Sequence, residues 1–346
     1  MALREILLTG SVPIHPASKV FELVSACCGD AMSRLPDGEQ AGWVDSVREQ
    51  IARNEALRPG QLTRIGKVST FSRGVQLYKL AAGRTSRDVS LGDLGIAANA
   101  LASYEQFSQL RAQGRIRNGV RFQATVPGPA TTGGTLELPE KDVYDIVLPT
   151  LQDELRRILD GIPVEDLTIQ LDLAVEVEKE EFRRRPHAFD TPVFAIRQFT
   201  FDGSVEAVAQ LAQAVPEEVE LGFHLCAMWH VYKDAGQDMA VHVDYSNALS
   251  RKIKRPIAYM HLPTTPEYDA ADFQPLARLE IHPETKLFLG LIHASDGLDG
   301  ARRRVLAAQK SVKDFGVAHF CGLSQWGAGP ETVEPMLRLH RQLAEA

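Results

Sequence analysis

The feature that most constrains the fold of this sequence is a regular alternation of short apolar runs with longer amphipathic stretches. The runs have the length of buried strands, and the stretches between them carry apolar residues at helical spacing. Eight such strand-to-helix units follow one another along the 346 residues. Strict alternation over this length predicts a closed parallel sheet wrapped in helices, an α/β (β/α)₈ TIM barrel that forms a single domain over residues 1–346.

The expected elements can be placed along the chain. We predict strands at residues 5–9, 31–36, 119–125, 167–172, 219–224, 256–261, 286–293 and 316–321. We predict helices at residues 17–28, 43–51, 94–112, 139–159, 204–214, 239–253, 298–312 and 331–345. Short alternating segments over residues 57–90 indicate a small inserted hairpin after the second unit. An open doubly wound sheet is the rival architecture, and it is disfavoured because no glycine-rich dinucleotide fingerprint opens a helix.

Composition narrows the class of partner. The formal net charge is −7, and a broad negative field attracts neither nucleic acid nor an anionic membrane. No stretch reaches the roughly 18 apolar residues of a membrane span, and the N-terminus enters a strand without a signal peptide. Four cysteines, with Cys27 and Cys28 adjacent, do not make a disulfide framework. We therefore expect a cytoplasmic protein that acts on small molecules, with a homodimer as the base-rate oligomer.

Two apolar runs end in residues that bind metals. His224 and Cys226 stand two residues apart at the end of one run, and Cys321 ends another, just before Gly322. A soft sulfur beside an imidazole suits Zn²⁺. If both runs are strands of one barrel, their ends face each other across its mouth, so the three side chains can share a metal. The plain alternative is that a cysteine on an apolar strand is a small buried hydrophobe.

Other polar residues gather at the same ends of the predicted strands. In a barrel of this kind the chemistry lies at the carboxyl ends of the strands. The residues there are Ser11, His15, Asp37, Glu39, Pro127, Thr131, Asp172, His224, Cys226, His261, His293, Asp296 and Cys321. This gathering predicts an active site at that end of the barrel.

Several motifs occur in the order in which a known superfamily has them. His224-Leu-Cys226, with a single Cys-Gly much later in the chain, resembles the zinc site of the cobalamin-independent methionine synthases. It is similar too to that of the epoxyalkane:coenzyme M transferases, and the superfamily also holds the uroporphyrinogen decarboxylases. Further motifs that resemble the family are Gly10-Ser11, Pro36-Asp-Gly-Glu39, Thr125-Val-Pro-Gly-Pro129 and Ile169-Gln-Leu-Asp172. The resemblance covers one barrel, whereas the synthases have a second, N-terminal barrel.

This resemblance implies a metal site and a reaction. Zn²⁺ would be held by His224, Cys226 and Cys321, and it would lower the pKa of a bound thiol so that the thiolate attacks an alkyl carbon. The family's fourth ligand, a glutamate on the sixth strand, falls on His261 in one register and on Asp244 in another. The implied activity is zinc-dependent transfer of an alkyl group, methyl first, to or from a thiol. The substrate would be small or aromatic, and a folate or a corrinoid is the implied methyl carrier.

The resemblance also suggests roles for residues beside the metal. Asp172 and Glu39 align with positions that hold a substrate ammonium or act as general acid or base in amino-acid-binding relatives, although a carboxylate after a strand also caps helices. Ser11 would hydrogen-bond the substrate unless it only serves the turn after Gly10. His293 is the first candidate for a proton shuttle. Residues expected to line the pocket are Asp37, Asp296, Trp229, His230 and Trp326, the aromatic ones as a wall whose plain alternative is rim packing.

Two other functions stay open at this point. A metal-independent decarboxylase or lyase on the same barrel would use Asp37 and arginines, as the decarboxylases of the superfamily do. A non-catalytic barrel would bind a ligand or present a methyl group to a corrinoid protein. The charged run at residues 178–185 invites comparison with an anion clamp, but we interpret it as a solvated loop.

Overall fold

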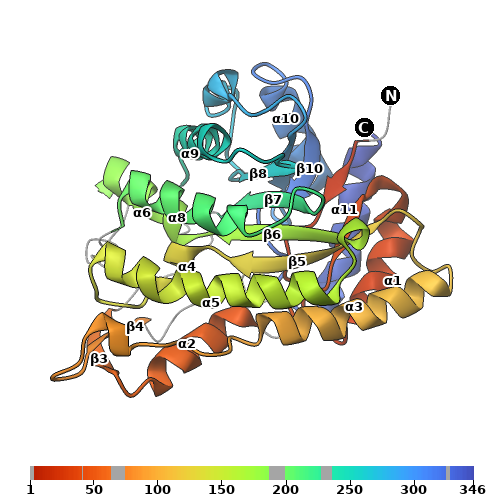
Figure 1. The fold of residues 1–346 in the computed structure, drawn as a ribbon. Helices are drawn as coiled ribbons and strands as arrows, with labels where there is room; N and C mark the ends of the chain where they lie inside the picture. The colour runs from red at the N-terminus through yellow and green to blue at the C-terminus, as the bar shows by residue number, and fades with distance from the viewer. Residues whose placement is uncertain (1–3, 41, 64–74, 187–198, 227–235, 325–327) are drawn as a thin grey trace.

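The computed structural model describes residues 4–40, 42–63, 75–186, 199–226, 236–324 and 328–346. Within them, eight parallel strands form one sheet that curves into a nearly closed barrel with the helices outside it (Figure 1). The strands are β1 (Ile6–Leu7), β2 (Arg34–Pro36), β5 (Arg121–Pro127), β6 (Leu167–Leu173), β7 (Glu220–Leu225), β8 (Tyr259–Pro263), β9 (Lys286–Ile292) and β10 (Gly316–His319). Their order in the sheet is β1-β10-β9-β8-β7-β6-β5-β2. The predicted barrel is confirmed.

Helices follow the strands where the apolar spacing predicts them, and α4 and α6 are two further helices that it did not predict. The helices are α1 (Ala17–Cys28), α2 (Trp43–Arg53), α3 (Ile96–Ala112), α4 (Pro129–Gly133), α5 (Glu140–Gly161), α6 (Val175–Arg184), α8 (Phe201–Gln213), α9 (Met239–Lys252), α10 (Gly297–Ala308) and α11 (Val333–Ala344). Short 3₁₀ turns are η1 (Gly29–Ala31), η2 (Ser86–Asp88), η3 (Val164–Asp166), η6 (Gln274–Arg278) and η8 (Pro330–Thr332). The inserted hairpin is also confirmed, as the antiparallel pair β3 (Leu57–Thr63) and β4 (Val75–Leu80). Among the described residues, no helix is long and apolar enough to cross a membrane.

The interpretation of residues 178–185 as a solvated loop is wrong. Most of this run belongs to α6, directly after β6, and Glu178, Glu180 and Glu181 are all buried. Buried carboxylates need partners, and Glu180 and Glu181 find them in the arginines at the end of the same helix. The run is therefore an ion-paired helix that packs beside the mouth of the barrel.

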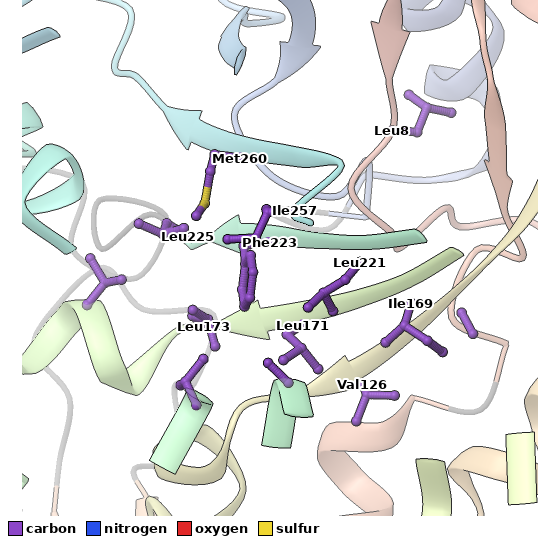
Figure 2. Packing of buried hydrophobic residues seen from close by; sticks show 14 of the residues in the cluster. Leu8, Val126, Ile169, Leu171, Leu173, Leu221, Phe223, Leu225, Ile257 and Met260 are labelled. Carbon is purple, nitrogen blue, oxygen red and sulfur yellow. The ribbon is translucent and has the colours of Figure 1, made fainter. Parts of the chain in front are cut away.

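Alternation along each strand sorts its side chains between the helices and the barrel interior. On β6 the apolar residues Leu171 and Leu173 lie in the core cluster beside Phe223 and Leu225 of β7 (Figure 2). Residues between them face the other way, because successive side chains of a strand point to opposite faces. Gln170 accordingly reaches the main chain of β1's exit, on a strand that is not its neighbour in the sheet.

The sheet has a seam between β1 and β2, which end the order of hydrogen-bonded strands. Side chains bridge it. Arg34 of β2 pairs with Glu5 at 3.4 Å. The amide of Gln123 donates to the Leu8 carbonyl at 3.0 Å, and that of Gln170 donates to the Thr9 carbonyl at 2.7 Å. These bonds hold the exit of β1, and hence Ser11, at the mouth of the barrel.

Replacement of Gln170 by leucine tests this bridge. The change keeps the volume but leaves the Thr9 carbonyl and the Tyr259 hydroxyl, which donates to Gln170 at 2.9 Å, without a partner. We expect a loss of roughly 2 to 6 kcal/mol in the free energy of unfolding, from about 1 to 3 for each of the two buried polar groups that are left unsatisfied. Urea denaturation measures it. Gln109→Leu on the exposed face of α3 is the control, and equal midpoints for the two variants would contradict the bridge.

Candidate metal centre

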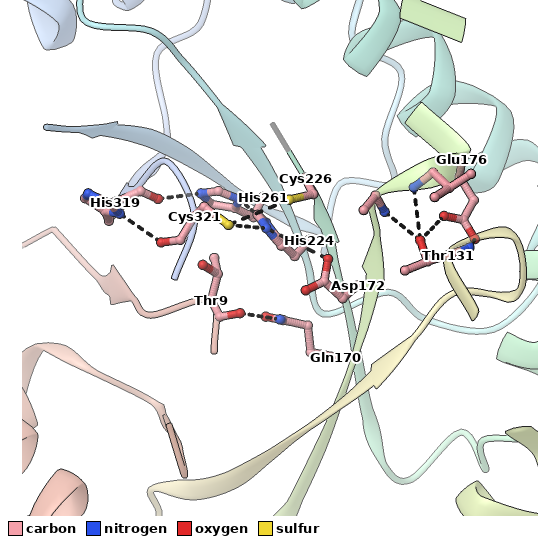
Figure 3. A network of polar contacts seen from close by, with 12 residues as sticks. Thr9, Thr131, Gln170, Asp172, Glu176, His224, Cys226, His261, His319 and Cys321 are labelled. Atoms are coloured by element: carbon pink, nitrogen blue, oxygen red, sulfur yellow. Dashed lines mark hydrogen bonds and ion pairs between the residues drawn. The ribbon is translucent and has the colours of Figure 1, made fainter. Parts of the chain in front are cut away.

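Three side chains meet at the carboxyl end of the barrel. His224 lies near the end of β7, Cys226 follows that strand, and Cys321 follows β10. Their ligand atoms all lie within 4.8 Å of one another, and all three residues are buried (Figure 3). The two sulfurs are 3.7 Å apart, and Cys321 Sγ is 3.6 Å from His224 Nε2. The predicted convergence of these distant segments is confirmed, and the group can hold a metal ion.

The neighbouring strands bring two further side chains to this group. The ladder pairs His224 with Asp172 of β6 on one side and with His261 of β8 on the other. Paired residues of adjacent parallel strands point to the same face of the sheet. Asp172, His224 and His261 therefore form a row across three strands, all inside the barrel.

Asp172 supplies a test of whether the group suits a cation. Its Oδ1 is buried, has no hydrogen-bond partner in the described part of the chain, and lies 4.0 Å from His224 Nε2. Burial raises the pKa of Asp172 well above its ordinary value, and Cys321 and Glu176 nearby raise it further. A carboxyl oxygen without a partner beside two soft sulfurs and an imidazole nitrogen fits Zn²⁺.

His261 lies beside the three-residue group and is not part of it. Its Nδ1 is 2.8 Å from His224 Nδ1, and its Nε2 is 3.0 Å from the carbonyl oxygen of His319. Burial lowers the pKa of His261 to about 3, so the ring is neutral. Asp244, the other candidate for a fourth ligand, is also outside the group, and its carboxylate pairs with Arg184 and Arg278.

Two glycines explain how the first strand's exit approaches the cysteines. A Cβ at Gly322 would lie 1.9 Å from Ser11 Oγ, so only glycine after Cys321 leaves room for that serine. A Cβ at Gly10 would lie 2.1 Å from Glu39 Oε1, so the Glu39 carboxylate rests on the Gly10 backbone. Glu39 itself has a φ of 56°, an uncommon conformation for a residue with a side chain. Ser11 and Glu39 are thus placed at the mouth; their roles stay predictions.

Asp37 has partners within its own turn. Its Oδ1 accepts from the Glu39 amide at 2.8 Å, and burial raises the pKa of Asp37, with a hydrogen bond from Ser103 opposing this. It lines a cavity of about 40 Å³ together with Glu39 and Asn99. Asp37 thus lies at a small cavity on the β2 side of the barrel mouth, and its role in binding a substrate stays a prediction.

His293 and Asp296 follow β9 and lie next to structural partners. His293 stacks on Phe320, with ring centroids 5.2 Å apart, and its Nε2 is 3.3 Å from Thr264 Oγ1. Asp296 binds the fully buried Arg304 at 2.6 and 2.8 Å and Arg303 at 3.1 Å. Neither residue is in the three-residue group.

Thr131 and His15, two other residues predicted at the strand ends, contact neighbouring polar groups. Thr131 donates to buried Glu176 at 2.5 Å and accepts from two amides at the start of α6, which ties α4 to α6. His15 lies 2.8 Å from Gln40 at the exposed rim. The predicted aromatic wall of Trp229, His230 and Trp326 lies outside the described residues.

Sequence reasoning missed His319 and His242. His319 Nδ1 donates to the Cys321 carbonyl at 2.9 Å, and His242 Nε2 lies 3.5 Å from the Cys226 carbonyl. Each thus contacts the main chain of a cysteine. The signal for His319 was its position two residues before Cys321, whereas nothing in the helical spacing of α9 distinguishes His242.

Comparisons with known proteins agree with this geometry at the level of the fold. No protein-family model and no curated protein sequence matches the chain. A B12-independent methionine synthase from Shewanella sp. W3-18-1, solved in complex with selenomethionine, superposes with a TM-score of 0.59 at 14% identity, over 100% of this chain and 97% of that one. A candidate B12-independent methionine synthase from Listeria monocytogenes superposes with a TM-score of 0.55 at 14% identity, over 95% and 86%.

The chain has the barrel fold of the B12-independent methionine synthases. At this identity the likeness extends to the fold alone, so the chemistry has to be argued from the three-residue group and its surroundings.

The ion pair of Asp296 generates a prediction about stability. Burial alone would raise the pKa of Asp296, but the hydrogen bonds and charge of Arg304 outweigh it and lower the pKa. Asp296→Asn leaves the buried guanidinium of Arg304 without its carboxylate, and we expect a loss of about 3 kcal/mol in the free energy of unfolding.

The pH dependence of that loss follows from the lowered pKa. The stabilisation by Asp296 is complete above the ordinary pKa of an aspartate, about 3.9, and is lost as the pH falls through the lower folded-state pKa. The difference between wild type and Asp296→Asn should therefore shrink in acid. Urea midpoints at pH 7 and below pH 4 measure it, with Asp299→Asn on exposed α10 surface as the control. A difference that persists in acid would contradict the assignment.

Proposed function

We propose that this chain is a zinc-dependent enzyme that transfers an alkyl group, with methyl as the first candidate, to or from a thiol. The observation that carries the proposal is the buried group of His224, Cys226 and Cys321 at the carboxyl end of the barrel, where barrels of this kind have their active sites. Zn²⁺, a metal ion without redox chemistry, is typically bound in proteins by cysteine sulfurs and histidine nitrogens. Two cysteines and a histidine therefore suit it. The likeness to methionine synthase barrels supports the same class of reaction.

Zinc held there would supply a positive charge that lowers the pKa of a thiol substrate. Asp172 lies next to His224, so its carboxyl group can orient the substrate or take up its proton. Glu39 and Ser11 stand at the exit of β1 and would hold the rest of the substrate. His293, buried next to Phe320, keeps its proposed role as a proton shuttle, and we propose that Asp37 and Asp296 act by holding the turns that line the pocket.

The Shewanella protein gives a first substrate class to examine, because it was solved in complex with selenomethionine. We propose a small thiol with an amino-acid-like ammonium as the acceptor, since Asp172 and Glu39 provide carboxylates at the mouth. The alkyl donor is a folate, a corrinoid-bound methyl group or a simple methyl compound, and a panel of labelled donors distinguishes them.

Metal content is the first test. We expect the purified protein to carry about one zinc per chain, and Cys226→Ser and Cys321→Ser to lose it, because each removes one of three ligands. Elemental analysis measures it. Cys27→Ser is the matched control, since Cys27 lies on α1 outside the metal-binding group. Full zinc retention in both ligand variants would end the proposal.

Replacement of Asp172 by asparagine separates chemistry from metal binding. We expect Asp172→Asn to keep its zinc and to lower the rate of labelled-methyl transfer by about 100-fold or more, the range for a lost acid–base group. Asp202→Asn on the exposed start of α8 should leave the rate unchanged. Wild-type turnover that survives complete removal of zinc by a chelator would instead favour a metal-independent lyase on the same barrel.

A further inference from the structure

The two ring nitrogens of His261 decide which nitrogen of His224 is available to a metal. A carbonyl oxygen can only accept a hydrogen bond, so His261 Nε2, 3.0 Å from the His319 carbonyl, carries a proton. The partners of His261 are this carbonyl and another imidazole, and a buried imidazolium without a carboxylate beside it is costly. His261 is therefore neutral, and its Nδ1 has a lone pair.

The proton between the two histidines then belongs to His224. Two nitrogens 2.8 Å apart share one proton, and because His261 Nδ1 is the acceptor, His224 Nδ1 is the donor. The lone pair of His224 is left on Nε2, the atom that lies 3.6 Å from Cys321 Sγ and 4.0 Å from Asp172 Oδ1. Figure 3 shows His224 between His261 and Asp172, in agreement with the pairing of their strands.

The His319 carbonyl, which accepts the hydrogen bond from His261 Nε2, is placed by an irregularity in the neighbouring strands. The pairing of β10 with β9 shifts register between Val317 and His319, and such irregularities re-aim groups beside active sites. Gly290 of β9 makes room for the shifted chain: a Cβ there would lie 2.6 Å from Phe320 Cα and 3.1 Å from the His319 carbonyl oxygen. The carbonyl can therefore meet His261 of β8, although β9 lies between the two strands.

We infer that His261 is a positioning residue, which fixes His224 with Nε2 toward the cysteines, and that the metal site contains a single imidazole and two cysteine sulfurs. This inference rests on the proposed zinc function and deepens it. Partners of this kind that orient a metal-binding histidine typically change metal affinity by 10- to 100-fold when they are removed. With three protein ligands the metal would keep a position for a substrate, and Asp172, whose Oδ1 lies 4.0 Å from His224 Nε2, could contact that substrate without displacement of a histidine.

Substitutions of His261 test the positioning role. His261→Ala should weaken zinc binding by about 10- to 100-fold in a chelator competition, with the zinc content at saturation unchanged. His261→Asn keeps an acceptor oxygen near the position of Nδ1, so it should recover most of that affinity. His340→Asn removes another buried imidazole, whose hydrogen bond among the described residues is to the Met336 carbonyl of its own helix α11, and it should bind zinc like the wild type. An equal loss in His340→Asn, or no recovery in His261→Asn, would overturn the inference.

Two spectroscopic measurements read the ligands directly. In the metal-free protein labelled with ¹⁵N, two-bond ring correlations should show the proton on Nδ1 of His224 and on Nε2 of His261. In the zinc-loaded protein, X-ray absorption should show one imidazole and two sulfurs, in both the wild type and His261→Asn. The opposite tautomers, or a second imidazole in the wild type that is lost in His261→Asn, would overturn the inference.

The same experiments keep the two proposals apart. If zinc binds with two imidazoles, the zinc function stands and the positioning role falls. If the protein takes up no zinc, the proposed function falls, and the single-imidazole site falls with it, whatever the tautomers of the metal-free protein.

Discussion

The register of β6, β7 and β8 is the constraint on which the candidate site depends. The ladder pairs Asp172 with His224 and His224 with His261, so three polar side chains stand in a row inside the barrel. A slip of one residue would turn a whole strand's set of side chains to the other face. The apolar residues between them, such as Leu171 and Phe223, prevent this because they are buried against the helices. Packing outside the barrel thus fixes the chemistry inside it.

Polar side chains contact one another at several heights inside the barrel. Their contacts compensate for the missing backbone hydrogen bonds between β1 and β2. Arg34 stacks on Tyr259, with its guanidinium carbon 4.8 Å from the ring centroid, and pairs with Glu5 and Glu220. Higher up, Gln170 joins Tyr259 to the main chain of the first strand's exit. Buried polar groups are costly unless they are paired, and here the pairs tie together strands that are not neighbours. Because side chains hold its exit, β1 needs only two ladder residues.

The strands could be predicted because most are buried on both faces, so that some have continuous apolar runs, as residues 287–292 of β9 do, and others alternate apolar with polar residues, as β6 does. The meeting of His224, Cys226 and Cys321 followed from the topology, since the ends of all strands in such a barrel converge. The burial of Glu181 could not be predicted, because it depends on Arg185 and on the Asp238 amide in space. Nor could the partners of His261, which depend on an irregularity of β10 that no sequence pattern marks.

Charge sets a further condition on what this site can accept. The hydrogen bond between Cys226 and Cys321, and then burial, raise the pKa of Cys226 well above its ordinary value, while burial raises that of Asp172. Cys226 therefore keeps its proton when no metal is bound, and a divalent cation would have to displace that proton to bind the sulfur. If Zn²⁺ binds as proposed, two thiolates would balance its charge, and His224 would enter as a neutral ligand. Any negative charge on Asp172 is then left over, and the group that balances it best is a cation on the substrate. A thiol that carries an ammonium satisfies both the metal and this carboxylate, whereas a purely apolar thiol leaves the carboxyl group protonated or unpaired.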